Sequence, residues 1–217
     1  MLRDDSIESL RRRARRRLPK AVFDFIDGGA EEEITLHRNL DDFSKVLLLP
    51  RSFVNVEHRD LGAMLLGRRA ELPLIVGPTG LAALVWPRAD SALARATTAA
   101  GLPFVVSTSS SMRLEDVRAA APSTISMLPE IRRAVAKDIE IYIDGGVRRG
   151  TDIVKAVASG ARAAMIGRAT LYGVGAAGPA GAQHALAILR REYDRAMALL
   201  GCPDTTALNS TMVRHRA

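Results

Sequence analysis

The chain has 217 residues, of which 47% are hydrophobic and 25% charged, a composition that is typical of a folded globular protein and excludes disorder across the whole chain. No stretch of about 18 apolar residues is free of charge, so we expect no membrane-spanning helix, and the charged start Met1–Asp5 does not resemble a secretory signal. The single cysteine, Cys202, excludes an internal disulfide and a cysteine metal cluster, so we expect a cytoplasmic protein. The length of the chain allows one large domain or two small ones.

The net charge of +7 comes largely from arginine, with clusters at Arg11–Arg13 and Arg15–Arg17. Aromatic residues make up only 4% of the chain, and no nucleic-acid-binding motif accompanies the clusters. We therefore interpret them as a solvated basic face of a helix, or as a site for acidic surfaces, and expect no nucleic acid partner.

Residues 5–45 are predicted to be helical. Ser6 is a suitable cap for a first helix with Ile7, Leu10 and Ala14 on one face. Pro19 opens a second short helix through Phe25. A turn at residues 27–29 follows, and the acidic residues 31–33 begin a third helix that ends near Lys45. Residues 46–71 suggest loops and short strands, with one strand at 61–66 and a turn at Gly67.

From Leu72 onwards short apolar runs alternate with amphipathic segments. The predicted strands are 74–76, 103–106, 139–143 and 163–166. The predicted helices are 88–100, 114–121, 124–136, 152–159 and 180–200. This alternation is typical of parallel βα units, which bind their ligands at the carboxyl ends of the strands.

Four βα units cannot close a (β/α)8 barrel, which needs eight strands and about 250 residues. The predicted fold is therefore α/β, with TIM-barrel-type βα units that form a partial (half) barrel of four strands after an N-terminal helical segment. We place the N-terminal segment at residues 1–71 and the partial barrel at residues 72–217.

Two of the predicted strands end in glycine turns that carry arginines. Glycine lets the backbone approach an anion, a helix N-terminus offers N–H groups, and arginine adds bidentate charge. We predict a phosphate site here, in preference to plain βα turns with surface arginines. Its residues are Asp144, Gly145, Gly146, Val147, Arg148, Gly167 and Arg168. Weaker candidates at the ends of the other two strands are Pro78, Thr79, Gly80 and Ser107; Ser107 is equally well explained as a helix cap.

No catalytic centre is evident from the residues alone. None of the four histidines, at positions 37, 58, 184 and 215, follows a predicted strand, where a catalytic base would be placed. No metal-ligand spacing, nucleophile elbow or Walker loop is present.

The chain closely resembles the FMN-dependent 2-hydroxy-acid dehydrogenases and oxidases, and most closely the (S)-mandelate dehydrogenase branch. The segments that carry the resemblance are LPKAVFDFIDGGAEEE, LIVGPTGLAALVWPRAD, ALARATTAAGLPFVVSTSSSM, IDGGVRRGTDIVKAVASGA, IGRATLYGV and LLGCPD. The resemblance implies FMN as cofactor and oxidation of a small 2-hydroxy acid to a 2-oxo acid by hydride transfer. It implies that residues 78–80 and Ser107 contact the flavin, and that residues 144–148, 167 and 168 hold its phosphate.

The chain departs from this family in one long stretch. After Pro122 the family's strands three to six are missing, with a junction near residues 121–123. The catalytic histidine, the arginine that binds the substrate carboxylate and the lysine beside the reduced flavin are lost with them. Phe25 replaces the family's active-site tyrosine. The resemblance therefore implies an impaired enzyme, without the membrane-associating segment that some members carry.

Strands seven, eight, one and two are neighbours in the closed barrel, so the retained units are expected to form one contiguous half. Its open edges predict a homo-oligomer in which two copies meet, or else aggregation. Two alternative functions stay open. One is a non-catalytic flavin- or phosphate-binding module. The other is a barrel enzyme of the inosine-monophosphate dehydrogenase type, against which the N-terminal block and the lack of a strand-end cysteine argue.

Overall fold

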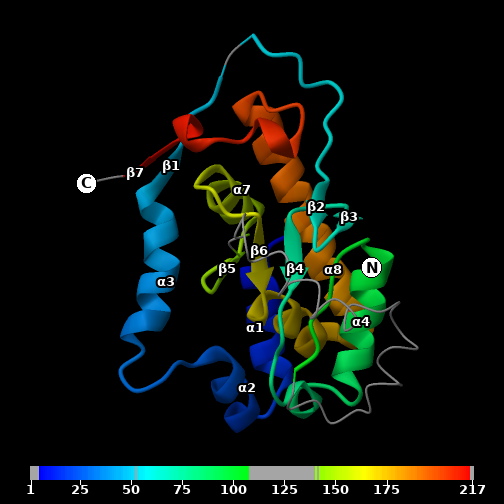
Figure 1. Ribbon diagram of the computed structural model, residues 1–217. Coiled ribbons are helices and arrows are strands. Elements are labelled where there is room, and N and C mark those ends of the chain that lie inside the picture. The colour runs from blue at the N-terminus through cyan, green and yellow to red at the C-terminus, as the bar shows by residue number, and fades with distance from the viewer. Residues whose placement is uncertain (1–4, 52, 108–139, 141, 216–217) are drawn as a thin grey trace.

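The structure is a computed structural model that describes residues 5–51, 53–107, 140 and 142–215 (Figure 1). Its central feature is a parallel sheet of three strands in the order β4–β6–β5. These strands are β4 (Leu74–Val76), β5 (Tyr142–Asp144) and β6 (Ala163–Ile166). Phe104 adds a single parallel bridge to Val76 on the outer side of β4. The strand expected at 103–106 is thus present only as this bridge. The spatial order is the one that the resemblance implies for strands seven, eight, one and two of a barrel.

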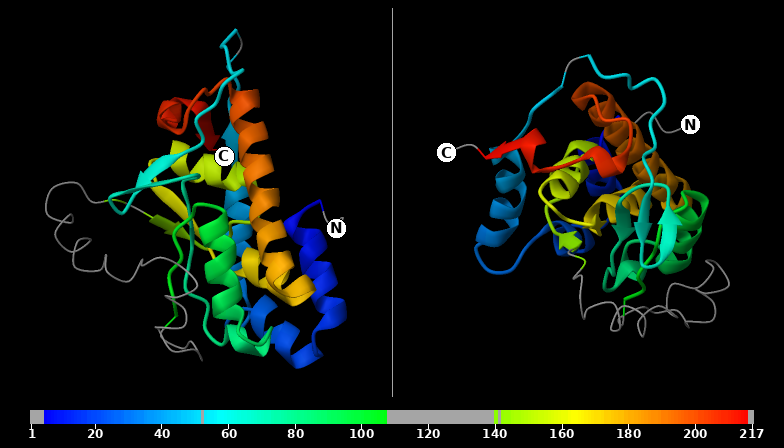
Figure 2. Two further views of the ribbon diagram at one scale, coloured as in Figure 1. Left: turned by 90° about the vertical axis from the view of Figure 1, so that its right-hand side faces the viewer. Right: turned by 45° about the horizontal axis from the view of Figure 1, so that its top comes forward.

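Helices cover one face of this sheet. They are α4 (Ala89–Ala99), α7 (Gly150–Ala158) and α8 (Arg168–Leu200), and Figure 2 shows α4 and α8 side by side along it. Alternate strand residues such as Leu74 and Val76 belong to the large core beneath these helices. Ile75 and Ala163 point to the other face, where they pack with the hairpin of β2 (Ala63–Leu65) and β3 (Arg68–Ala70). The expected single strand at 61–66 is thus one arm of a hairpin that turns at Gly67.

The first two helices follow the predicted pattern. Ser6 caps α1 (Ile7–Arg17), and the apolar stripe of Ile7, Leu10 and Ala14 is buried against α8. The second helix, α2 (Lys20–Asp27), begins after Pro19 and runs two residues beyond the expected end, to the residue before Gly28. Most of the clustered arginines on α1 face solvent, as a basic face requires.

The third helix, α3 (Ile34–Lys45), lies along one side of the molecule (Figure 1). It begins after the acidic residues rather than among them, because Glu33 has φ +59° and its side chain accepts a hydrogen bond from Gly29 N–H at 2.9 Å. After α3 comes β1 (Val46–Leu48), which pairs antiparallel with β7 (Val213–His215) near the end of the chain. Lys155 Nζ on α7 donates to Phe43 O at 2.8 Å and holds the end of α3 to the barrel part.

Helix α8 starts earlier than the sequence predicted. Its dihedral angles break at Ala177 and Gly178, before Pro179, so the expected helix at 180–200 follows a first helical stretch from Arg168. That stretch is rich in glycine, which has a low helix propensity, and it is stabilised instead by close packing. A Cβ on Gly175 would lie only 3.0–3.3 Å from the side chains of Leu18, Val85 and Ala14.

The remaining described elements are short. They are the 3-10 helices η1 (Ala82–Leu84), η3 (Thr205–Ala207) and η4 (Ser210–Met212). The helices expected at 114–121 and 124–136, and the junction at 121–123, lie outside the described residues. Within the described part, no helix has the length and apolar character needed to cross a membrane. The same residues contain no cluster of three or more histidine, cysteine or acidic side chains that could hold a metal ion.

Candidate functional site

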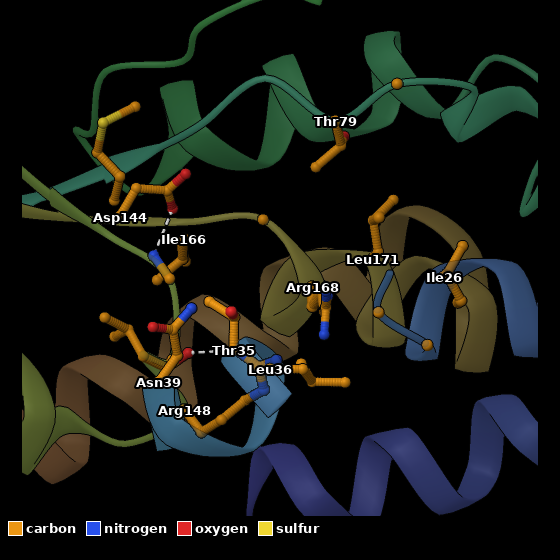
Figure 3. A pocket seen from close by; sticks show the side chains of 18 of the residues that line it. Ile26, Thr35, Leu36, Asn39, Thr79, Asp144, Arg148, Ile166, Arg168 and Leu171 are labelled. Atoms are coloured by element: carbon orange, nitrogen blue, oxygen red, sulfur yellow. Dashed lines mark hydrogen bonds between the residues drawn. The ribbon is translucent and has the colours of Figure 1, made fainter. Parts of the chain in front are cut away.

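A cavity of about 500 Å³ lies at the carboxyl ends of β4, β5 and β6, between these strand ends and the connection from α2 to α3 (Figure 3). Every residue predicted from the strand ends lines it, except Ser107. These residues are Pro78, Thr79, Gly80, Asp144, Gly145, Gly146, Val147, Arg148, Gly167 and Arg168. Ser107 is half-buried but is not among the lining residues, so its contact with a ligand stays a prediction. Three separate turns thus converge on one space whose volume is within the usual range for ligand pockets.

The turn after β5 has the backbone that its glycines predict. Gly145 and Gly146 have φ values of +97° and +78°, which glycine adopts without strain. The Asp144 Oδ1 atom accepts the Gly145 N–H at 2.8 Å and fixes the turn. A Cβ on Gly146 would lie 2.0 Å from the backbone oxygen of Asn39. The close approach of α3 is therefore by itself enough to require glycine there.

The amino end of α7 differs from what its sequence predicts. We expected free backbone N–H groups there for an anion. Instead, the Asp152 carboxylate accepts the N–H groups of Arg148 at 3.0 Å and Arg149 at 2.9 Å. An acidic side chain at the third position of a helix commonly accepts backbone N–H groups at the start of that helix. The position of Asp152 in the sequence therefore already indicated this hydrogen bonding. Positive charge at this end of the cavity consequently comes from side chains.

Two guanidinium groups supply that charge. Arg148 follows the β5 turn, and Arg168 is the first residue of α8, directly after β6. Burial lowers the pKa of Arg148, and the nearby positive charge of Arg168 also lowers it. Two like charges held close together in a partly buried place favour an anion between or beside them. Phosphate, with several acceptor oxygens, suits such a pair.

Thr79 gives the cavity a second, neutral polar contact. Among the described residues, its Oγ1 is a buried side-chain polar atom without a hydrogen-bond partner. Figure 3 shows Thr79 across the cavity from the two arginines. A buried hydroxyl left without a partner costs about 1–3 kcal/mol, which a bound polar group would recover. Gly167 keeps this place open, because a Cβ there would lie 3.0 Å from Thr79 Cγ2.

The wall opposite the strand ends was not predicted from the residues. It is formed by Ile26 of α2, by the following glycine turn, and by Thr35, Leu36 and Asn39 of α3. Phe25, which the resemblance places at an active-site position, also lines the cavity and is 54% exposed. None of the four histidines, all of which lie in the described part of the chain, is among the lining residues.

Comparisons with known proteins identify the family to which the chain is related. The FMN-dependent dehydrogenase family matches residues 14–121 and 119–215 in two consecutive pieces. (S)-mandelate dehydrogenase from Pseudomonas putida is 26% identical, with 94% of this chain and 92% of that protein covered. Mouse 2-hydroxyacid oxidase 1 is 46% identical over 93 residues, which are 43% of this chain and 25% of that protein.

A solved structure gives the same result for the fold. It is a soluble mutant of the membrane-associated (S)-mandelate dehydrogenase from Pseudomonas putida, with a TM-score of 0.88 and 27% identity over 98% of this chain and 99% of that chain. The predicted partial barrel of the TIM type is confirmed. The family match spans most of the chain and confirms the resemblance. The chain belongs to the family of FMN-dependent 2-hydroxy-acid dehydrogenases and oxidases, whose cofactor is FMN.

Proposed function

We propose that this chain binds FMN in the cavity at the strand ends, with Arg148 and Arg168 on the phosphate and Thr79 beside the flavin ring. The observation that supports this most strongly is the convergence of three predicted turns on one cavity. The residues fit the cofactor, because two clustered cations match a phosphate and the Thr79 hydroxyl has no partner of its own within the described residues. We assign the remaining predicted residues, 78, 80, 144–147 and 167, to the walls of the same site.

We further propose a small (S)-2-hydroxy acid, such as mandelate or lactate, as the substrate class. When bound, FMN supplies the acceptor for a hydride from the carbon that bears the hydroxyl. This chain must then remove the hydroxyl proton with a base within hydrogen-bond reach. Asp144 is the carboxylate among the lining residues, and it already accepts the Gly145 N–H. Phe25 offers only an apolar ring at the cavity mouth.

These features support a strongly impaired oxidoreductase when the chain acts alone. The alternative function, a flavin-binding module without catalysis, shares the same site and differs only in turnover. The cavity lining formed by the described residues favours the alternative, since it includes two arginines and one acid but no histidine or lysine. Slow bleaching of the bound flavin over hours, after anaerobic addition of the acid, would favour the impaired oxidoreductase, whereas a flavin that stays fully oxidised would favour the module.

We also propose that two copies associate through their open strand edges. The alignment with (S)-mandelate dehydrogenase runs over 362 residues although this chain has 217, so a long internal part of the relative has no counterpart here. The two family matches meet at residues 119–121, beside the predicted junction at 121–123. The order β5–β6–β4 with Phe104 beyond β4 corresponds to half of an eight-stranded barrel, which a second copy would complete.

Light scattering after size-exclusion chromatography tests this association. We expect a mass of twice 23.4 kDa, or larger assemblies. A single compact species of one chain mass would contradict the proposal.

Binding of FMN is tested by an absorbance spectrum of the purified protein. After incubation with FMN and removal of free cofactor by filtration, we expect the flavin bands to stay with the protein. Riboflavin, which lacks the phosphate, is the matched control and should be removed more completely. A colourless protein after filtration would contradict the proposed site.

A further inference from the structure

A cluster of hydrogen bonds lies directly behind the two arginines of the cavity. Its centre is Asp27, the last residue of α2. Its carboxylate accepts Arg11 Nε at 2.6 Å on one oxygen and Arg11 Nη2 at 2.7 Å on the other. Tyr172 Oη donates to the same carboxylate at 2.8 Å. Three helices, α1, α2 and α8, therefore meet at one side chain that is 19% exposed.

This cluster contacts both arginines of the cavity. Arg168 Nη1 donates to the backbone oxygen of Asp27 at 3.3 Å. The guanidinium of Arg148 lies 5.7 Å from the centre of the Tyr172 ring, in the range of a cation–π interaction. Arg168 and Tyr172 are four residues apart on α8, so they share a helix face. Arg148 Nη1 also donates to the backbone oxygen of Val147 at 2.9 Å. Asp27 therefore contacts Arg168 directly and reaches Arg148 through the ring of Tyr172.

The charges in this cluster are well defined near neutral pH. Burial raises the pKa of Asp27, but the hydrogen bonds from Arg11 and Tyr172 outweigh it and leave the pKa below its ordinary value. Burial raises the pKa of Tyr172 to about 12. Asp27 is therefore an ionised acceptor and Tyr172 a protonated donor, which is the arrangement that makes the hydrogen bonds between them strong.

We infer that Asp27, acting through Tyr172 and through its own backbone oxygen, is a positioning residue that orients Arg148 and Arg168 toward the phosphate of FMN. This inference rests on the proposed FMN site. It extends that site to α1, because Arg11 of α1 binds the Asp27 carboxylate, and Asp27 in turn contacts Arg168. A purely structural role would instead be to clamp α1 and α2 onto α8.

The test compares FMN with riboflavin in the full chain, by flavin fluorescence titration. We prepare Asp27→Asn, which removes the charge, and Tyr172→Phe, which removes only the hydroxyl. If both residues orient the arginines, the dissociation constant for FMN should rise by about tenfold in each, since loosely held guanidinium groups lose much of their charge-assisted bonding. The dissociation constant for riboflavin should change by less than about twofold, because it lacks the phosphate.

Asp24→Asn is the matched control. Asp24 lies on the same helix, and its carboxylate pairs with the exposed Lys20 at the surface. This variant makes the same chemical change without touching the cluster, so it should retain the FMN and riboflavin affinities of the unaltered chain. Thermal unfolding followed by circular dichroism identifies any variant that has lost its fold.

The outcomes separate the two proposals. An unaltered chain that does not prefer FMN over riboflavin would overturn the phosphate site and, with it, this inference. A clear preference in the unaltered chain that stays unchanged in folded Asp27→Asn or Tyr172→Phe would overturn the inference alone. So would an equal loss of both flavins, because that is the result of a structural clamp. If Asp27→Asn does not fold, Tyr172→Phe decides by itself.

Discussion

Replacing Arg148 and Arg168 together by methionine should abolish the retention of FMN by this chain. Both guanidinium groups line the cavity, and hydrogen bonds to charged groups contribute about 1.5–3 kcal/mol each. Losing one arginine should therefore weaken FMN binding by about tenfold or more, and losing both by about a hundredfold or more. Methionine keeps an unbranched, flexible stem and removes the guanidinium group, with both its charge and its N–H donors. The measurement is a fluorescence titration with FMN at fixed ionic strength.

The control for this experiment is Arg190→Met. Arg190 also lies on α8, but it is half exposed and its guanidinium lies 3.7 Å from the surface residue Glu71. The affinity for FMN should be unchanged in this variant. Riboflavin should bind the double variant about as well as the unaltered chain. Undiminished FMN binding in the folded double variant would show that the phosphate lies elsewhere.

Anaerobic addition of (S)-mandelate or (S)-lactate should leave the flavin of the isolated chain oxidised on the scale of minutes. No histidine lines the cavity within the described residues, and loss of general-base catalysis alone reduces rates by about 10²–10⁴-fold. The resemblance also implies the loss of two positively charged side chains, one that binds the substrate carboxylate and one beside the reduced flavin. Their absence would lower the rate further. Loss of the visible flavin bands measures the reaction, and chemical reduction with dithionite confirms that the bound flavin can be reduced.

The variant Phe25→Tyr tests whether the missing hydroxyl by itself limits the reaction. It restores a hydroxyl at the cavity mouth, where Phe25 is 54% exposed, but it supplies no base at neutral pH. We therefore expect the flavin to stay oxidised in this variant as well. Rapid bleaching of the unaltered chain by either acid would contradict the proposed impairment and would require a base from another part of the chain or from a second copy.

The strand ends could be predicted because the residues that define them are adjacent in the sequence. Leu74–Val76 and Ala163–Ile166 are short apolar runs followed by small residues, and both are strands that end at the cavity. Parallel connectivity then brings those ends to one edge of the sheet without any knowledge of side-chain packing. The capped start of α1 is local in the same sense, since Ser6 and the apolar stripe after it are close in the sequence.

The other half of the site depends on contacts between distant residues. Nothing near Gly146 in the sequence indicates that Asn39 of α3 lies against it. The bond between Tyr172 and Asp27 likewise joins residues 145 positions apart. Spacing does reveal that Arg168 and Tyr172 share a face of one helix, but the partner of that face is set by how α1 and α2 dock. Such docking depends on packing, which periodicity does not encode.

The pairing of β1 with β7 also bears on how the cavity is completed during synthesis. Val46–Leu48 forms its ladder with Val213–His215, near the opposite end of the chain. Contacts of such long sequence separation form late, because a large loop must close before they stabilise anything. A nascent chain emerging from the ribosome cannot form this ladder until residue 215 has left the exit tunnel. The ladder therefore adds the last support to the α3 wall, after the bond from Lys155 to Phe43 O, and we expect tight capture of the cofactor only once residue 215 has emerged.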